Sequence, residues 1–256
     1  MSPNIGKSQR LYSLDDLYLM VTSIYGEQNA DRSPTATFAH FVEVCGMLTA
    51  HDRQKRREES DFEGALCRAL GWFFPLLAKF KVSSVERLVY RKYPYACPYC
   101  RECPHNDRVC KTTQGTGRTV DHDALKRKYV ENLGRLPGNL NAWQQMFEDI
   151  YRRESSSVGS GRSSIALLEE LGELAEAVRV YDRHPKYFAG EAADVFSYLM
   201  GFANEYSSKL QIQDDSQFDF QASFLRRYPG LCPSVVTSKP AIGGRVKTGQ
   251  WEAVRD

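Results

Sequence analysis

The segment Leu167–Val178 reads LLEELGELAEAV, and the segment Glu191–Met200 that follows it reads EAADVFSYLM. In both segments apolar residues recur at every third or fourth position, which is the spacing of an amphipathic helix. The stretch between them is polar and contains Pro185, which favours a turn. Together they predict two long helices, from about residue 163 to 182 and from about 188 to 210, joined by a short loop.

Helical spacing also appears over residues 14–26, 38–48, 62–80 and 141–153. Alternating patterns of strands and helices are absent from the sequence, so we expect an all-α protein. Helices of this length, when short loops join them, pack as bundles. The fold class is therefore predicted to be all-α, with helical bundles.

The chain contains two similar halves. Phe41–Leu48 aligns with Leu167–Leu174, and the motif Arg91–Pro94, followed by Cys97, aligns with Arg226–Pro229, followed by Cys232. Similar stretches in the same order predict a tandem duplication. We expect the following divisions: a first helical repeat over 1–92, a Cys-rich segment over 93–118, a connector over 119–140, a second helical repeat over 141–222 and a tail over 223–256.

Composition restricts the class of protein. A chain of 256 residues with 42% hydrophobic and 26% charged residues can bury a substantial core. The sequence has no apolar run of about 18 residues, the length that crosses a bilayer, so we expect a soluble cytoplasmic protein without a membrane partner. The net charge of +2 gives no general argument for nucleic-acid binding.

Acidic residues concentrate on the two long helices of the second half. Glu170 and Glu173 lie one turn apart on the first helix, and Glu191 and Asp194 lie one turn apart on the next. If the helices pack antiparallel, four carboxylates meet and offer an all-oxygen site for Mg²⁺ or Mn²⁺. The alternative is an ordinary solvated helix face. No basic residue lies between Glu169 and Glu176, which favours the metal site.

Glu169-Glu170-Leu-Gly-Glu173 followed by Glu191-Ala-Ala-Asp194 resembles the EExxE…ExxD motif of the MazG-like, all-α nucleoside triphosphate pyrophosphohydrolases. The resemblance covers residues 141–210 well and residues 11–80 faintly. It implies hydrolysis of a (d)NTP to a (d)NMP and pyrophosphate. It also implies that Glu170, Glu173, Glu191 and Asp194 hold Mg²⁺, and that Glu169 orients or deprotonates water.

A triphosphate substrate needs further groups. Basic residues that follow the acidic segment are candidates for binding the pyrophosphate: Arg179, Arg183 and Lys186. Tyr198 lies one turn beyond Asp194 and is the first candidate for stacking on the base, and Trp143 is the second. The alternatives are surface charges and core aromatics.

The first half lacks most of the acids. Glu43 stands where the second half has Glu169, and Glu63 stands where it has Glu191. Val44, Met47 and Leu66 stand at the positions of the other three proposed ligands, Glu170, Glu173 and Asp194. A site with one remaining carboxylate does not hold a hard cation. We therefore predict a catalytically inactive first repeat, which forms a pseudo-dimer with the second repeat. A homo-oligomer or a protein partner is compatible with this organisation.

Five potential metal ligands lie close together in the sequence between the halves: Cys97, Cys100, Cys103, His105 and Cys110. A CxxC turn presents two thiolates to one ion, so we expect structural Zn²⁺ bound by Cys97, Cys100 and Cys110, with Cys103 or His105 as the fourth ligand. An iron–sulfur centre remains the alternative. Tyrosines and basic residues surround the cluster, and binding of single-stranded nucleic acid is a less favoured role.

These observations predict a Mg²⁺-dependent nucleoside triphosphate pyrophosphohydrolase, a hydrolase of acid anhydrides, whose active site lies in the second half. The competing hypothesis is a nucleotide-sensing or partner-binding regulatory protein that keeps the site for binding alone.

Overall fold

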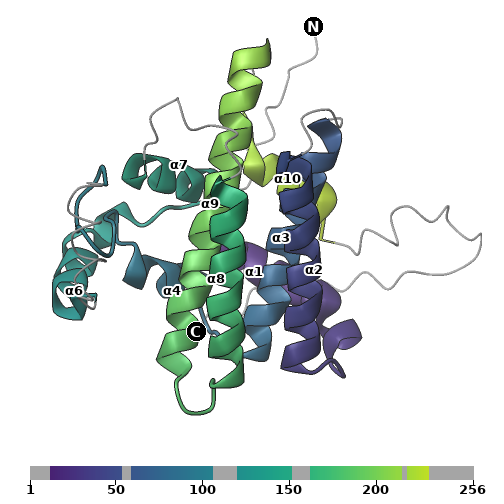
Figure 1. The fold of residues 1–256 in the computed structure, drawn as a ribbon, viewed down its shortest axis with the longest axis horizontal. Coiled ribbons are helices and arrows are strands. Elements are labelled where there is room, and N and C mark those ends of the chain that lie inside the picture. The colour runs from purple at the N-terminus through teal and green to yellow at the C-terminus, as the bar shows by residue number, and fades with distance from the viewer. Residues whose placement is uncertain (1–11, 54–58, 106–119, 152–161, 215–217, 231–256) are drawn as a thin grey trace, which may run out of the picture.

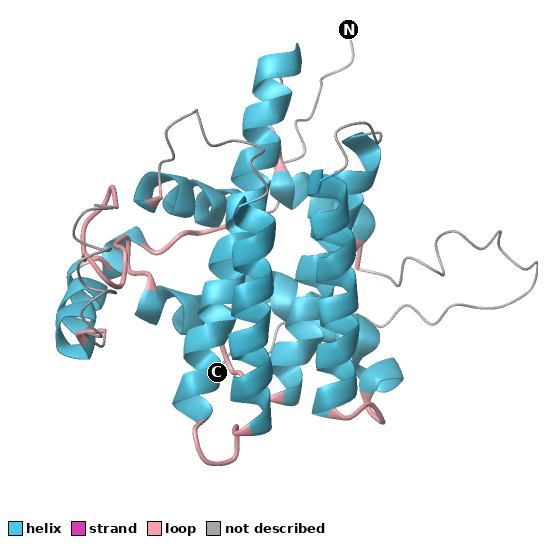
Figure 2. Ribbon diagram, in the orientation of Figure 1, coloured by secondary structure: helices cyan, strands magenta, loops and turns pink. Residues whose placement is uncertain are grey.

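A computed structural model describes residues 12–53, 59–105, 120–151, 162–214 and 218–230. Within these ranges all regular structure is helical (Figure 2), which confirms the all-α prediction. The elements in chain order are α1 (Leu14–Asn29), α2 (Pro34–Arg53), α3 (Glu59–Lys79), α4 (Val85–Lys92), α6 (His122–Glu131), the 3₁₀ turn η1 (Leu133–Arg135), α7 (Leu140–Ile150), α8 (Arg162–Arg179), α9 (Pro185–Asp214) and α10 (Phe220–Arg227).

The four long helices α2, α3, α8 and α9 run alongside one another in the centre of the molecule (Figure 1). Each half contributes one pair, α2 with α3 and α8 with α9, and the pairs meet through α2 with α8 and α3 with α9. Aromatic side chains fill this junction: the rings of Phe73 on α3 and Phe196 on α9 lie 6.1 Å apart, and both are fully buried. Burial of such large apolar side chains is the main stabilisation of the bundle.

The last helix of each half packs on the other half. Helix α4 contacts α9, and α10 contacts α3. Both are eight residues long, and the side chain of Ser84 or Asp219 caps the N-terminus. Both end at a tyrosine in nearly the same conformation, Tyr93 at φ −122°, ψ 65° and Tyr228 at φ −123°, ψ 71°. This reciprocal packing places the end of α4 against the hairpin formed by α8 and α9, which carries the predicted acidic ligands.

Gly71 allows α10 to approach α3 closely. A Cβ atom at this position would lie 2.2 Å from the hydroxyl oxygen of Tyr228 and 2.5 Å from the adjacent ring carbon. The same tyrosine ring packs against Phe224 on α10 and meets Tyr25 on α1 edge to face. Glycine is therefore required for steric reasons where the tyrosine ring crosses the helix.

The region that the sequence predicted to be a connector, residues 119–140, contains α6 and η1. Asn132 attaches it to α4 and to the residues that follow α4: the Tyr90 hydroxyl donates to the Asn132 carbonyl at 2.6 Å, and the Asn132 side chain donates to the Pro94 carbonyl at 2.9 Å. The polar composition of α6 concealed this helix, since only Ala124 and Leu125 are buried. The tail from residue 231 onward lies outside the described residues.

Candidate functional site

Three of the predicted acidic ligands converge between α8 and α9. One carboxylate oxygen from each of Glu170, Glu173 and Glu191 lies within 4.8 Å of the other two. Glu191 is buried, Glu170 is half-buried and Glu173 is exposed. The antiparallel hairpin therefore forms a cluster that is closed on one side and open to solvent on the other, and we call these residues the acid trio.

The acid trio is electrostatically unfavourable when no cation is bound. Burial, followed by the negative charges of Asp194, Glu173 and Glu191, raises the pKa of Glu170 to about 8. Burial also raises the pKa of Glu191 to about 7, although Lys92 acts in the opposite direction. One carboxylate oxygen of Glu170 and one of Glu191 are buried without a hydrogen-bond partner. Buried unpaired oxygens of this kind suit a hard divalent cation.

Asp194 lies beside the trio with its own partners. It is 7% exposed, and its two carboxylate oxygens accept hydrogen bonds from Lys92 Nζ and from the Tyr93 hydroxyl. Burial raises the pKa of Asp194, whereas these two partners lower it. The structure thus brings three of the four predicted ligands together and holds the fourth next to them, close enough for its charge to act on Glu170.

Sequence reasoning did not place Lys92 and Tyr93 beside the acids. Both stand at the end of α4, and Lys92 Nζ also donates to the Gly190 carbonyl on α9 at 3.3 Å. The available signal was the motif Arg91–Pro94, which recurs as Arg226–Pro229. That motif indicated a duplication but did not indicate which helix its side chains would reach.

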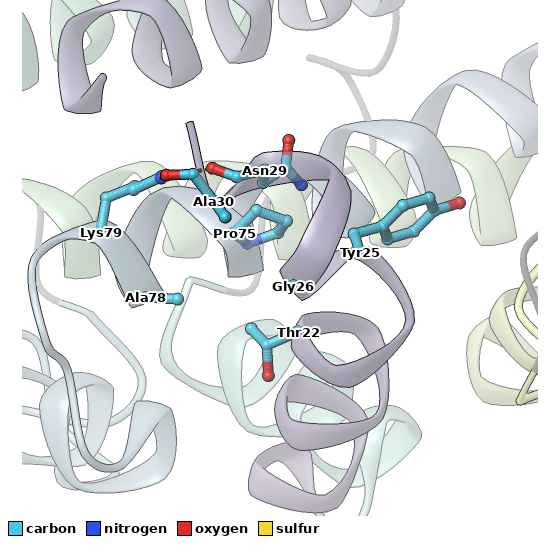
Figure 3. Close-up of a pocket in the computed structure, with 8 residues that line it drawn as sticks. All are labelled: Thr22, Tyr25, Gly26, Asn29, Ala30, Pro75, Ala78 and Lys79. Carbon is cyan, nitrogen blue, oxygen red and sulfur yellow. Dashed lines mark hydrogen bonds between the residues drawn. The ribbon is translucent and has the colours of Figure 1, made fainter. Parts of the chain in front are cut away.

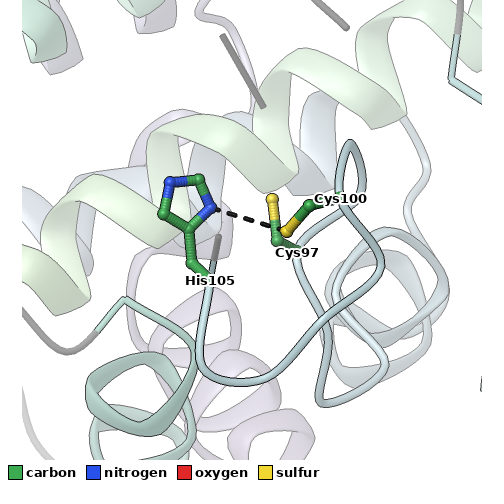
Figure 4. Close-up of side chains that lie close together, drawn as sticks. All are labelled: Cys97, Cys100 and His105. Atoms are coloured by element: carbon green, nitrogen blue, oxygen red, sulfur yellow. Dashed lines mark hydrogen bonds between the residues drawn. The ribbon is translucent and has the colours of Figure 1, made fainter. Parts of the chain in front are cut away.

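The cysteine segment forms a second candidate metal centre. The ligand atoms of Cys97, Cys100 and His105 lie within 4.8 Å of one another, and Cys100 Sγ is 3.8 Å from His105 Nδ1 (Figure 4). Backbone geometry supports the turn: the Arg101 N–H donates to the Cys97 carbonyl at 2.8 Å, and Arg101 has φ 61°. The His105 N–H donates to the Ile150 carbonyl at 2.6 Å, which fixes the histidine against α7.

The other two predicted zinc ligands, Cys103 and Cys110, are not among the three residues that the structure brings together. Cys103 is exposed and is not part of the group, so the structure brings His105 rather than Cys103 to the pair of buried thiols. Cys110 lies outside the described residues. Two thiols and one imidazole form an incomplete tetrahedral set for Zn²⁺.

The two candidate metal centres are adjacent. Tyr99, between Cys97 and Cys100, lies near the acids: burial and the charges of Asp194, Glu170, Glu191 and Glu173 all raise the pKa of its hydroxyl. Tyr151 also lies between the centres: its ring is 6.2 Å from that of Tyr93, which donates to Asp194, and burial and then the neighbouring Cys97 thiol raise the pKa of its hydroxyl. The cysteine segment therefore covers one side of the acidic site.

The predicted substrate-binding residues lie in several environments. Arg179, Arg183 and Lys186 are exposed around the α8–α9 turn, where Arg183 and Lys186 line a shallow groove with Tyr187. Burial and then the charge of Glu191 raise the pKa of Tyr187, so this groove adjoins the trio. Glu169 is exposed and lies outside the trio, and Tyr198 is half-buried on α9.

The prediction that Trp143 stacks on a base does not agree with its position. Its side chain is fully buried, with its ring edge to face with Tyr90 and Phe196. Trp143 belongs to the hydrophobic core at the α7–α9 contact. Tyr99 is an aromatic side chain that does lie next to the acids.

A separate hollow between α1 and α3 carries no comparable chemistry. Figure 3 shows its lining, which consists of Thr22, Tyr25, Gly26, Asn29, Ala30, Pro75, Ala78 and Lys79. The ammonium of Lys79 donates to the carbonyls of Asn29 and Ala30 at the end of α1. This lysine therefore stabilises a helix terminus.

Comparisons with protein-family models, curated proteins and solved structures find no match for this chain. In the part of the chain that the structure describes, no helix combines the length and the apolar character needed to cross a membrane.

Proposed function

We propose that the protein is a metal-dependent nucleoside triphosphate pyrophosphohydrolase whose active site lies between α8, α9 and the end of α4. The observation that carries the proposal is the acid trio with its two buried, unpartnered carboxylate oxygens. Such oxygens are costly in a protein interior unless a cation binds them. Their arrangement on an antiparallel hairpin follows the motif that resembles the MazG-like enzymes.

The donor set suits Mg²⁺ or Mn²⁺. Glu170, Glu173 and Glu191 would hold the ion, and Asp194 would join them when its bond to Lys92 is released. When bound, such an ion neutralises phosphate charge and lowers the pKa of water. The carboxylates alone would repel a triphosphate, so binding of substrate depends on the ion.

The chain's own residues supply positioning and charge. Tyr93 holds Asp194 through its hydroxyl, and Lys92 supplies a cation where phosphate oxygens would lie. Arg183 and Lys186 are exposed at the α8–α9 turn and are candidates for binding the departing pyrophosphate. Tyr99 offers an aromatic face for the base beside the acids. Glu169, exposed on α8, keeps its proposed role of orienting water.

We further infer that the two halves arose by duplication and form a pseudo-dimer with one active site. The reciprocal packing of α4 on α9 and α10 on α3 supports this, because a two-fold arrangement makes each contact twice. The matching caps and equal lengths of α4 and α10 support it as well. In the first half, Val44 and Leu66 are buried apolar residues at positions of the acids.

We propose that Cys97, Cys100 and His105 hold a structural Zn²⁺. Both thiols are buried, and residues 93–105, the described part of this segment, form no helix, so a metal ion would supply stability that a small core does not. Because Tyr99 lies between the two thiols, the zinc-binding turn would then line one side of the active site.

The test is release of pyrophosphate from a panel of NTPs and dNTPs with and without Mg²⁺. We expect turnover in wild type and at least a 100-fold loss in Glu173→Ala and Asp194→Ala, with unchanged helical circular dichroism. Glu43→Ala is the matched control, since Glu43 is exposed on α2 in the half that lacks the trio. Tight nucleotide binding without turnover would reject the enzyme and favour the regulatory alternative.

A further inference from the structure

Three arginines gather where α10 packs on α3, away from the acid trio. Arg226 on α10 forms an ion pair with Glu63 on α3 at 2.8 Å and donates to Ser223 Oγ at 2.8 Å. Burial raises the pKa of the neighbouring Cys67 thiol to about 12, the charge of Glu63 raises it further, and Arg227, Arg226 and Arg68 lower it. Arg226 thus contacts α3 directly through Glu63, and Arg68 and Arg227 lie close enough to Cys67 for their charges to act on its thiol.

The arginines of α10 lie against the first half in the place that corresponds to that of Lys92 and Tyr93 of α4 against the second half. Arg227 is the last residue of α10 and Tyr228 is its cap, as Lys92 and Tyr93 are for α4. Lys92 and Tyr93 both bind Asp194, but the corresponding residue on α3 is Leu66, which is fully buried. At this contact Arg227 stands where α4 has Lys92, whereas Leu66 stands where α9 has the carboxylate of Asp194.

Arg227 consequently has an unsatisfied donor. Its guanidinium reaches the Tyr228 hydroxyl, yet its Nε is buried without a hydrogen-bond partner. Leaving a buried donor of a charged group unpaired is costly, and an anion that accepts from it would remove the cost. The side chain of Arg226 is 66% exposed, so an anion from solvent has access to the cluster.

We propose that Arg68, Arg226 and Arg227 form a second, metal-independent binding site for phosphate groups. Guanidinium forks match the oxygens of phosphate, and several arginines at one point favour an anion with more than one charge, such as pyrophosphate or the phosphate chain of a nucleotide. The acid trio, in contrast, accepts phosphate through a divalent ion. The proposal of an arginine site does not depend on whether the acid trio is catalytic.

The experiment is isothermal titration calorimetry in EDTA, with inorganic pyrophosphate in one arm and ATP in the other. We expect wild-type protein to bind pyrophosphate without metal, with an affinity that falls as salt rises. Arg227→Gln should weaken binding at least tenfold. Arg101→Gln is the matched control, because Arg101 is exposed and pairs with Asp121 at 3.0 Å far from this site along the chain. It should bind as wild type does.

Further arms separate this site from the acid trio and from a folding defect. Glu191→Gln should leave binding in EDTA unchanged. If Arg227→Gln does not fold by circular dichroism, Arg68→Gln replaces it and should also weaken binding. ATP that binds no more tightly than pyrophosphate indicates recognition of phosphate alone, and tighter ATP binding adds the nucleoside to the ligand. Absence of pyrophosphate binding in EDTA, or binding that survives in an Arg68→Gln/Arg227→Gln double variant, overturns the proposal.

Discussion

Replacing Glu170 by glutamine should stabilise the metal-free protein while weakening its response to Mg²⁺. The pKa of Glu170 is raised from an ordinary value of 4.5 to about 8, because burial and three neighbouring carboxylates disfavour its charge. Each pKa unit corresponds to about 1.4 kcal/mol, but the side chain is only half-buried and water screens it, so we expect about 1–2 kcal/mol at pH 8. For a chain of this size this is a rise in Tm of roughly 3–6 °C.

The assay is thermal and urea unfolding at pH 8 in EDTA and again in saturating Mg²⁺. Wild type should gain about 2–3 kcal/mol from an ion present at about 100 times its Kd, and Glu170→Gln should gain much less. Glu169→Gln is the control, because it removes the adjacent, exposed carboxylate and should change stability by no more than about 0.5 kcal/mol. The reasoning is refuted if Glu170→Gln is no more stable than wild type in EDTA.

Three further changes test other parts of the structure. In EDTA, stability measured by urea unfolding should fall as pH rises from 4.5 to about 8, because the two raised carboxyls bind protons more tightly in the folded chain than in the unfolded chain, and saturating Mg²⁺ should flatten this slope. Gly71→Ala should cost about 1–3 kcal/mol, since its Cβ would meet Tyr228, whereas Gly64→Ala on the same helix should gain about 0.5–1 kcal/mol; equal stability of the two variants would contradict this packing. Cys97→Ser should abolish the thiolate-to-metal absorption of the Co²⁺-substituted protein, whereas Cys103→Ser should retain it, and the reverse result would exclude the ligand set.

The long helices and the acid trio were predictable from sequence because both depend on spacing along one or two adjacent elements. Apolar periodicity predicted α8 and α9, and an i, i+3 pair such as Glu170 and Glu173 must share a face of its helix. Trp143 shows the limit of this reasoning. Its spacing was correct for α7, but spacing alone does not distinguish an aromatic that packs in the core from one that faces a ligand.

Contacts between segments that are distant in the chain could not be predicted from the sequence pattern. Lys92 reaches Asp194 across about a hundred positions of the chain because α4 packs on the opposite half. Tyr99 was visible only as part of a cysteine motif, and its place beside the acids depends on how that turn folds back. A single sequence does not show directly which distant helices pack together. The repeated motif at the ends of α4 and α10 was an indirect indication that these two helices occupy equivalent places.

The exchange of α4 and α10 gives the first half a role in the acidic site although it lacks the acids. Asp194 is almost fully buried, and both donors that satisfy its carboxylate come from the first half. A second half separated from α4 would leave that charge buried and unpaired, which is more costly than never having formed the pair. The first half, which has Val44 and Leu66 where we align Glu170 and Asp194 of the second, is therefore still needed to satisfy the buried carboxylate of the acidic site.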